Sequence, residues 1–375
     1  MPKGKTGMKR LTIPFAREKL SGLFIPLGSL VLALIMGGVL LFISGYNPIA
    51  AYGAMITGAF GSLDSIADTL GIATPLILCG VAVAIAMVGG VINIGCEGQL
   101  YTGALCAAVL GIFLPPLPPP VLILLCFCGS LVGGGLWAGL AGYLKYKMRS
   151  NEVVLTIMLN YIAIFLTDYI VTVWLKAPGM SIRTPNVQAG AVLPVLYPYS
   201  RFTIGFLAAV AAVVIVRWLL KNTAFGFEVR AMGMNPLAAV TAGINTNRQF
   251  VITMFISGAL AGLAGGIEVL GVHKYFIKGF SPGYGYDGLA IAVLGQNDPA
   301  GVFAAALLYG ALRSGAQVMD RATRIPKDFV VVLQALIIIF VATPGIVLAL
   351  RKSTRGPGRL PGNTAKTRKG RQSHE

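Results

Sequence analysis

The sequence predicts an all-α, polytopic helical membrane protein. Of its 375 residues, 56% are hydrophobic and only 11% are charged, and the mean hydropathy is +0.78, whereas a soluble domain has about 25% charged residues. The apolar runs are long and continuous, which fits membrane-spanning helices. They exclude a β-barrel, whose strands alternate in polarity over about ten residues. Most of these side chains must therefore face lipid or one another.

The formal net charge of +17 indicates a membrane topology rather than a nucleic-acid partner. Of the 30 lysines and arginines, 21 occur in segments that can all be cytoplasmic, as the positive-inside rule requires. These segments are residues 1–19, 145–149, 217–248 and 351–375. We expect a transmembrane domain over 21–350, with basic cytoplasmic tails at 1–20 and 351–375 that are disordered or rest near anionic lipid. Both termini are then cytoplasmic.

About ten spans are predicted. The first six cover about residues 23–44, 67–92, 99–114, 121–144, 153–175 and 202–220. The polyproline corner at 115–120 cannot stay helical, and it separates the third span from the fourth. Residues 176–200 form the longest polar connection on the outer side, and we expect residues 49–66 to lie along the interface.

The last four predicted spans cover residues 249–272, 289–297, 300–318 and 328–350. Gly258, Gly262 and Gly266 follow one another at every fourth position and let neighbouring helices approach closely. The eighth span is short and broken, and a re-entrant segment there would change the count. With ten crossings Arg321, Arg324 and Lys327 are outside, which fits the charge bias poorly.

Glycine pairs near the ends of the second and seventh spans, Gly89–Gly90 and Gly265–Gly266, suggest two halves related as inverted repeats. The two spans would point in opposite directions around a pathway at the bilayer midplane. Glycine pairs are common in membrane helices, so this pattern alone is weak evidence for a repeat.

Residues 221–248 are a cytoplasmic stretch that contains a miniature helix. Asn235 can cap it, Pro236 suits its first position, and Gly243 supplies a left-handed stop. A helix of one or two turns is marginal alone, because nucleation costs more than so few residues return. The segment is therefore expected to rest on its own protein or on a partner.

The stretch from Asn93 to Gln99 carries a carboxylate, Glu97, between two amides and beside glycines. Such a group is costly at bilayer depth and would have to face protein or water, as in a pathway or gate. It could equally form a cytoplasmic turn with a solvated Glu97. The residues alone leave both alternatives open.

Other polar residues fall near predicted helix ends or within spans. Asn151 is expected to cap the fifth span, and Glu152 suits the positive end of that helix. Asn160 and Asp168 lie deeper and favour contacts across helices. Glu268, in the seventh span, is expected to pair inside the bundle.

Residues 283–288 match the pattern G-x-G-x-x-G, but membrane helices flank them, so a dinucleotide fold is excluded. We expect a glycine-loosened loop that enters a half-helix, with Asp287 as a lining or capping group. Gln296 and Asn297 would end that half-helix.

Signs of catalysis or cofactor binding are lacking in the sequence. It contains no P-loop pattern, and its two histidines, His273 and His374, cannot build a metal site. The five cysteines lie in apolar surroundings and fit small buried residues. We therefore expect no cofactor and no enzymatic activity in this chain.

Four blocks together resemble bacterial ABC transporter permeases of the branch that handles nucleosides and simple sugars, related to ribose and branched-chain amino acid permeases. They are Asn93-Ile-Gly-Cys-Glu-Gly-Gln, Asn151-Glu-Val-Val-Leu-Thr-Ile-Met-Leu-Asn-Tyr-Ile, the loop from Arg230 to Ile244, and Gly285-Tyr-Asp-Gly-Leu-Ala-Ile-Ala-Val-Leu-Gly. The resemblance covers nearly all spans, and the first block favours the nucleoside branch. Cys96, where a smaller residue is expected, and the basic C-terminal tail depart from the pattern.

The resemblance implies a multi-pass permease of the bacterial inner or plasma membrane. Its implied partners are a cytoplasmic ABC ATPase, a second homologous permease and an extracytoplasmic substrate-binding lipoprotein. It places the ATPase-coupling helix in the 230–244 loop, on Arg230, Gly233, Asn235, Pro236, Ala238, Ala239, Gly243 and Ile244. We place the translocation pathway on Asn93, Glu97, Gln99, Asn160, Asp287, Gln296 and Asn297.

Three alternatives to a nucleoside permease stay open. A simple-sugar permease belongs to the same class. An ion-coupled secondary transporter would also use half-helices and buried carboxylates, although it needs no docking helix for a motor. A membrane scaffold without transport activity is the third.

Overall fold

The computed structural model describes residues 31–148, 150–326 and 328–340, and these are almost entirely helical. Within these ranges, seven helices are long and apolar enough to cross a membrane. β-Structure within the described ranges is limited to two isolated bridges, Arg183–Ile277 and Val195–Thr203. The predicted all-α polytopic fold is confirmed. The expected tails, 1–20 and 351–375, lie outside the described residues.

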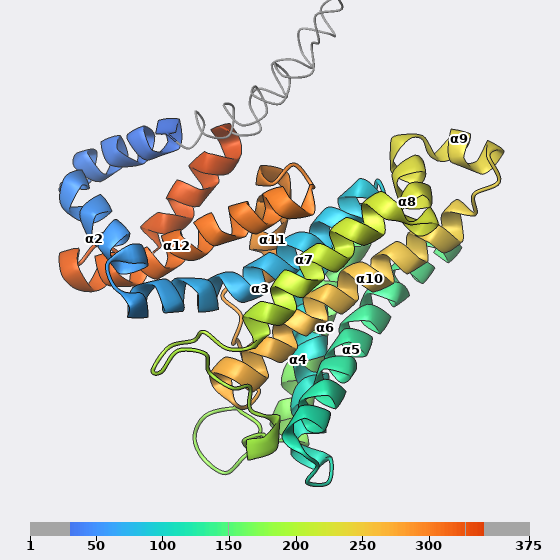
Figure 1. Cartoon of the computed structure of the whole chain (residues 1–375), viewed down its shortest axis with the longest axis horizontal. Helices are drawn as coiled ribbons and strands as arrows, with labels where there is room; N and C mark the ends of the chain where they lie inside the picture. Colours follow the sequence, from blue (N-terminus) through green and yellow to red (C-terminus); the bar gives the residue numbers. More distant parts are fainter. Residues whose placement is uncertain (1–30, 149, 327, 341–375) are drawn as a thin grey trace, which may run out of the picture.

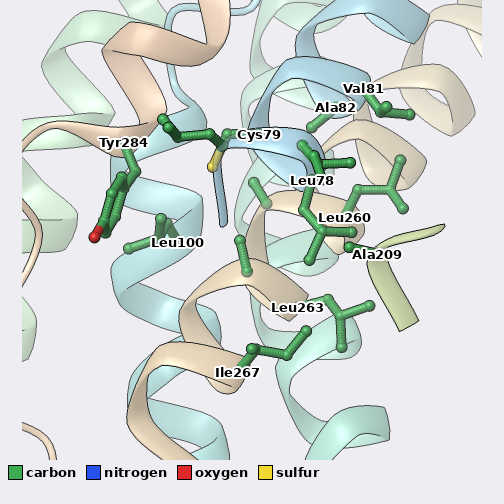
Figure 2. Packing of buried hydrophobic residues seen from close by; sticks show 14 of the residues in the cluster. Leu78, Cys79, Val81, Ala82, Leu100, Ala209, Leu260, Leu263, Ile267 and Tyr284 are labelled. Atoms are coloured by element: carbon green, nitrogen blue, oxygen red, sulfur yellow. The ribbon is translucent and has the colours of Figure 1, made fainter. Parts of the chain in front are cut away.

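Helix α3 (Leu63–Val88) runs through the centre of the molecule, with α7 (Gly205–Asn222), α10 (Thr246–Ile267) and α12 (Pro299–Thr323) packed around it (Figure 1). Its 26 residues extend about 39 Å at 1.5 Å per residue. Nearly all its side chains beyond the first turn are buried. Figure 2 shows Leu78 and Ala82 of α3 packed among Leu260 and Leu263 of α10. The outer helices α5 (Pro119–Met148) and α6 (Glu152–Val173) carry more of the exposed apolar surface.

Glycines bring α10 into backbone contact with α5 and with α4 (Cys96–Phe113). A Cβ atom on Gly262 would lie 2.2 Å from the Ser130 carbonyl oxygen, and one on Gly103 would lie 2.2 Å from the Cα of Gly262. The close approach predicted for the glycines of the seventh span is confirmed. Gly265 and Gly266 lie inside α10, which continues as the π-helix η2 (Glu268–His273). Gly89–Gly90, by contrast, ends α3, so the inverted repeat stays a prediction.

A second, smaller group of helices lies to one side of the main bundle (Figure 1). It contains the helices Val31–Ile43 and Phe329–Phe340, together with α2 (Pro48–Phe60) and part of α12. Residues 49–66 form most of α2 and the start of α3, and their expected position along the interface stays a prediction. Helix α2 packs so closely against α12 that a Cβ on Gly315 would lie 2.4 Å from the Met55 carbonyl oxygen. Gly315 of α12 and Gly58 of α2 allow this contact.

An ion-pair cluster fixes the direction of α12. Asp298, its N-cap, lies 2.9 Å from both Arg217 and Lys221 at the C-terminal end of α7. Burial alone would raise the pKa of Asp298, but these two cations outweigh it and lower the pKa. The 25 residues of α12 then extend about 37 Å, so Arg321 lies at the end of the molecule opposite α7's C-terminus.

Helix α11 (Tyr284–Leu294) has only 11 residues, about 16 Å, and a crossing needs about 20 residues. It begins five residues before the predicted start of the eighth span, because Gly283 adopts φ +92° and starts the helix there. The expected half-helix is present. The count of ten crossings is therefore not established, since α11 covers only part of the bilayer.

Substitution at Gly262 should destabilise the bundle. The Gly262→Ala Cβ would meet backbone atoms of α5, and overpacking of this kind costs about 1–3 kcal/mol. Gly139→Ala is the matched control on α5, because its Cβ would meet only the Phe255 ring at ordinary contact distance. Thermal unfolding in detergent should show a lower midpoint for Gly262→Ala alone; equal midpoints would contradict the packing.

Candidate functional site

The chain between α3 and α4 breaks inside the bundle. Gly89 ends α3, and Gly90 turns the chain back with φ +73°. The Sγ of Cys96, at the start of α4, faces the carbonyl oxygen of Cys79 at 3.9 Å. Cys79 lies nine residues before the end of α3, so α4 begins about 14 Å above that end. The break is therefore at membrane depth.

Asn93 is fully buried and is the centre of this break. Its Nδ2 donates to the Gln99 side-chain oxygen at 3.0 Å and to Ser257 Oγ of α10 at 2.8 Å. Its Oδ1 accepts from the Gln99 amide at 3.0 Å and from the Gly95 N–H at 2.9 Å. Ser257 in turn donates to the carbonyl of Ala82 in α3. These hydrogen bonds pair the polar groups of the turn, which lipid could not do.

Asn160 joins α6 to the same break. Its Nδ2 donates to the Ile94 carbonyl at 2.7 Å, and its Oδ1 accepts from the Gly98 N–H at 2.8 Å. The Ile94 carbonyl and the Gly98 N–H are backbone groups without a hydrogen-bond partner inside a helix. Asn160 itself is fully buried. The expected contact of Asn160 across helices is confirmed.

Glu97 joins the break to α11. Its carboxylate is 3% exposed and accepts the Gly285 N–H at 2.7 Å. Because Glu97 is in the first turn of α4 and Gly285 is in the first turn of α11, one negative charge lies beside the positive ends of two helices. The burial of Glu97 excludes the alternative of a solvated cytoplasmic turn. Asp287, also in the first turn of α11, pairs with Arg313 of α12.

Gln296 and Asn297 lie elsewhere. They adopt left-handed conformations, φ 54° and 56°, in the turn that ends α11. This turn adjoins Asp298 and its cations, at the opposite end of α11 from Glu97. The structure therefore gathers Asn93, Glu97, Gln99 and Asn160 with the start of α11, and it separates the last two predicted residues from them. Whether any of them lines the pathway stays a prediction.

Polar residues outside the break also have partners. Asn151 caps α6 through the Val153 N–H at 2.9 Å, and Glu152 pairs with Lys145 at 2.7 Å. Asp168 lies 3.4 Å from Lys278. Glu268 lies 3.7 Å from Nε2 of His273. The capping by Asn151 and the inward position of Glu268 agree with the sequence-based expectations.

The stretch 221–248, predicted to be cytoplasmic, contains two helices, α8 (Ala224–Met234) and α9 (Pro236–Thr241), at one end of the bundle (Figure 1). Asn235 caps α9 through the Ala238 N–H at 3.1 Å. The chain leaves α9 through Gly243, at φ +84°, and the N–H of Ile244 donates to the Ala239 carbonyl. The predicted miniature helix is confirmed. Helix α8 was not predicted.

The eight predicted coupling residues differ in exposure. Four of them are exposed, namely Asn235, Pro236, Ala238 and Gly243. Ala239 of α9 is buried, and the other three are half-buried, namely Arg230, Gly233 and Ile244. Three apolar side chains that sequence reasoning missed are more prominent, namely Met234, Leu237 and Val240, at 87%, 81% and 56% exposed. Met234 ends α8, whereas Leu237 and Val240 lie on α9. The three-residue spacing of Leu237 and Val240 was the available signal, because it places them on one face of a helix.

Gly233 connects this loop to the break. A Cβ on Gly233 would lie 2.1 Å from the Val88 carbonyl oxygen and 3.0 Å from the Gly90 nitrogen. The backbone of the last turn of α8 therefore touches the residues at which α3 ends and the break begins. A cavity of about 550 Å³ beside this contact is lined by Gly90, Lys145, Gly233, Pro236 and Phe250, among others.

A multi-pass helical bundle, a polar break at membrane depth and an exposed helix that touches this break are features of a transport permease. Residues 65–342 match the family described as the permease component of branched-chain amino acid transport systems, and the chain belongs to this family. Membership implies an ATPase and a substrate-binding protein as partners in general, and a multi-pass location in the plasma membrane.

Three relatives are similar over most of their length. The guanosine ABC transporter permease protein NupP of Bacillus subtilis is 37% identical over 336 residues, covering 87% of this chain and 94% of the relative. The nucleoside ABC transporter permease protein NupB of Lactococcus lactis is 33% identical, covering 88% and 93%. The glucose ABC transporter permease protein TsgB13 of Haloferax volcanii is 33% identical, covering 85% and 86%.

Removing the Glu97 carboxylate should weaken the joint between α4 and α11. Glu97→Ala leaves the buried Gly285 N–H without its acceptor, which costs about 1–3 kcal/mol. Glu97→Gln keeps an oxygen acceptor and should lose less. Thermal unfolding and uptake by the assembled transporter measure the effect. An alanine variant with the stability and uptake of the wild type would contradict the role given to this contact.

Proposed function

We propose that this chain is the membrane-spanning subunit of an ABC importer for nucleosides, driven by separate ATPase subunits. The observation that carries the proposal is α9, a capped and exposed helix that directly follows α8, whose Gly233 touches the intramembrane break. Such an arrangement suits a permease that receives its energy from a docked motor. An ion-coupled carrier would have no use for it.

The substrate class rests on the relatives. Two of the similar permeases are named for guanosine and nucleosides, and the block from Asn93 to Gln99 resembles the nucleoside branch. The glucose permease of Haloferax volcanii is nearly as similar, so a simple sugar is the second candidate. A direct comparison of the two substrates decides between them.

The ATPase would dock on Met234, Leu237 and Val240. Met234 ends α8, and Leu237 and Val240 follow on α9. Exposed apolar side chains close together in this way are typical of a site for a partner. Asn235 and Gly243 hold the helix in shape from either end. Motion of the docked ATPase would then pass from Gly233 to Gly90 and into the break.

The orientation follows from charge. Arg217, Lys221, Arg230 and Arg248 cluster around α8 and α9, so we place this end in the cytoplasm. The N-terminal tail comes before the helix Val31–Ile43, and the C-terminal tail comes after the helix Phe329–Phe340. We place both tails on this same side. The connection between α6 and α7 lies at the opposite end (Figure 1), where an extracytoplasmic substrate-binding lipoprotein would deliver its ligand. A second homologous permease would complete the membrane unit.

Uptake by the reconstituted transporter tests this function. Proteoliposomes that contain the permease pair, the ATPase and the binding protein should accumulate labelled guanosine only with ATP, and an ionophore that collapses ion gradients should leave uptake unchanged. Glucose uptake without guanosine uptake would support the sugar alternative. Uptake abolished by the ionophore would support a secondary transporter, and no transport of any solute would support a scaffold.

Leu237→Ala should weaken binding of the ATPase. An exposed leucine at the centre of a docking surface contributes more than 1 kcal/mol, and a loss of about 1.4 kcal/mol is tenfold in affinity. Leu63→Ala is the matched control, since Leu63 is 71% exposed but starts α3 at the opposite end of the molecule. Affinity for the ATPase, measured in nanodiscs, should fall for Leu237→Ala alone; equal affinities would remove α9 as the docking site.

A further inference from the structure

A polar cavity of about 470 Å³ lies at the N-terminus of the half-helix α11. Residues of α3, α11, α12 and the helix Phe329–Phe340 line it, among them Tyr284, Arg313, Gln317, Arg321 and Gln334. Arg201, which precedes α7, lines it as well. Because α7 ends and α12 begins at the α9 end of the molecule, the cavity lies near the opposite end, which is the extracytoplasmic end in the proposed orientation.

Gln334 is the first indication of a ligand. Its side chain is 5% exposed, and its Nε2 has no hydrogen-bond partner among the described residues. A buried amide donor without a partner costs about 1–3 kcal/mol, and such groups are rare in folded proteins. A ligand that offers an acceptor in the cavity would satisfy it.

Tyr284, which is largely buried, and Arg313 line the cavity together. The Arg313 guanidinium carbon lies 5.2 Å from the centre of the Tyr284 ring. Arg313 is also held by Asp287 and by the Pro282 carbonyl. In Figure 2 the Tyr284 hydroxyl points away from the other labelled side chains, which belong to the apolar core. A planar group could pack against this pair.

The remaining lining residues carry both charges. Two cations, Arg201 and Arg321, accompany two anions, Asp320 and Asp328, and Gln317 offers both a donor and an acceptor. Arg313 is already paired with Asp287, so its positive charge is largely neutralised and attracts a ligand only weakly. The set therefore suits a neutral molecule with donors and acceptors on both sides better than it suits an anion.

We propose that this cavity is a binding vestibule for a nucleoside on its way into the permease. The flat base would pack near Tyr284 and Arg313 and accept a hydrogen bond from Gln334, and the ribose hydroxyls would meet Gln317, Asp320 and Arg321. A volume of this size suits a small ligand, since binding pockets measure about 300–1,000 Å³. The choice of a nucleoside rests on the proposed function.

Protection of an introduced thiol tests the vestibule in the complete transporter. Gln317→Cys and, as a second variant, Arg321→Cys would be treated with a membrane-impermeant thiol reagent from the outer side. Guanosine at about ten times its dissociation constant should slow the reaction about tenfold, because only the unoccupied fraction reacts. Met180→Cys, in the exposed connection between α6 and α7, is the control whose rate should not change. The wild-type chain corrects for labelling of the exposed Cys128.

Adding Gln334→Leu to either cysteine variant should abolish the protection. The proposal is overturned if guanosine protects neither thiol, if it slows the control equally, or if Gln334→Leu leaves the protection unchanged. Protection by glucose and not by guanosine would overturn the ligand class. Failure of the proposed function is a separate result, since it would appear as absent ATP-dependent guanosine uptake in the unmodified transporter.

Discussion

A helix can break inside a membrane only if protein groups satisfy the backbone atoms that the break leaves unpaired, since lipid cannot do so. In this permease Asn93, Glu97 and Asn160 meet that requirement with contacts to α10, α11 and α6. The positions of these three helices are thus tied to one turn of polar chain. The glycine contacts of α10 with α4 and α5 bring the backbones of the surrounding bundle close together.

The break also lies between the two ends of the proposed transport machinery. At the α9 end, Gly233 touches Gly90, where the break begins. At the other end of the break, Glu97 binds the first turn of α11, and Tyr284 of that same turn lines the proposed vestibule. About ten residues of chain and one buried carboxylate therefore connect α9 to the proposed vestibule, and packed side chains and hydrogen bonds of this kind can carry coupling between distant sites.

Local signals made part of this structure predictable. Hydropathy placed the long helices to within a few residues, and the caps of α9 follow from Asn235, Pro236 and Gly243 because capping depends on neighbours in the chain. The site itself depends on distant partners. Asn93 binds Ser257, 164 residues away, and Glu97 binds Gly285, 188 residues away. No periodicity or spacing could have paired them, so the sequence left a solvated turn and a membrane pathway equally open, and only burial decided against the turn.

The central claim is that ATP-driven motion at α9 reaches the break through the contact of Gly233 with Gly90. Hydrogen–deuterium exchange of the complete transporter measures this directly, with and without a non-hydrolysable ATP analogue. In the wild type the analogue should change exchange both in peptides that cover α9 and in those that cover residues 89–99. In Gly233→Ala, whose Cβ would displace Val88 and Gly90, the change should remain at α9 and be lost at the break. A change at the break that survives Gly233→Ala, or its absence from the wild type, would contradict the account.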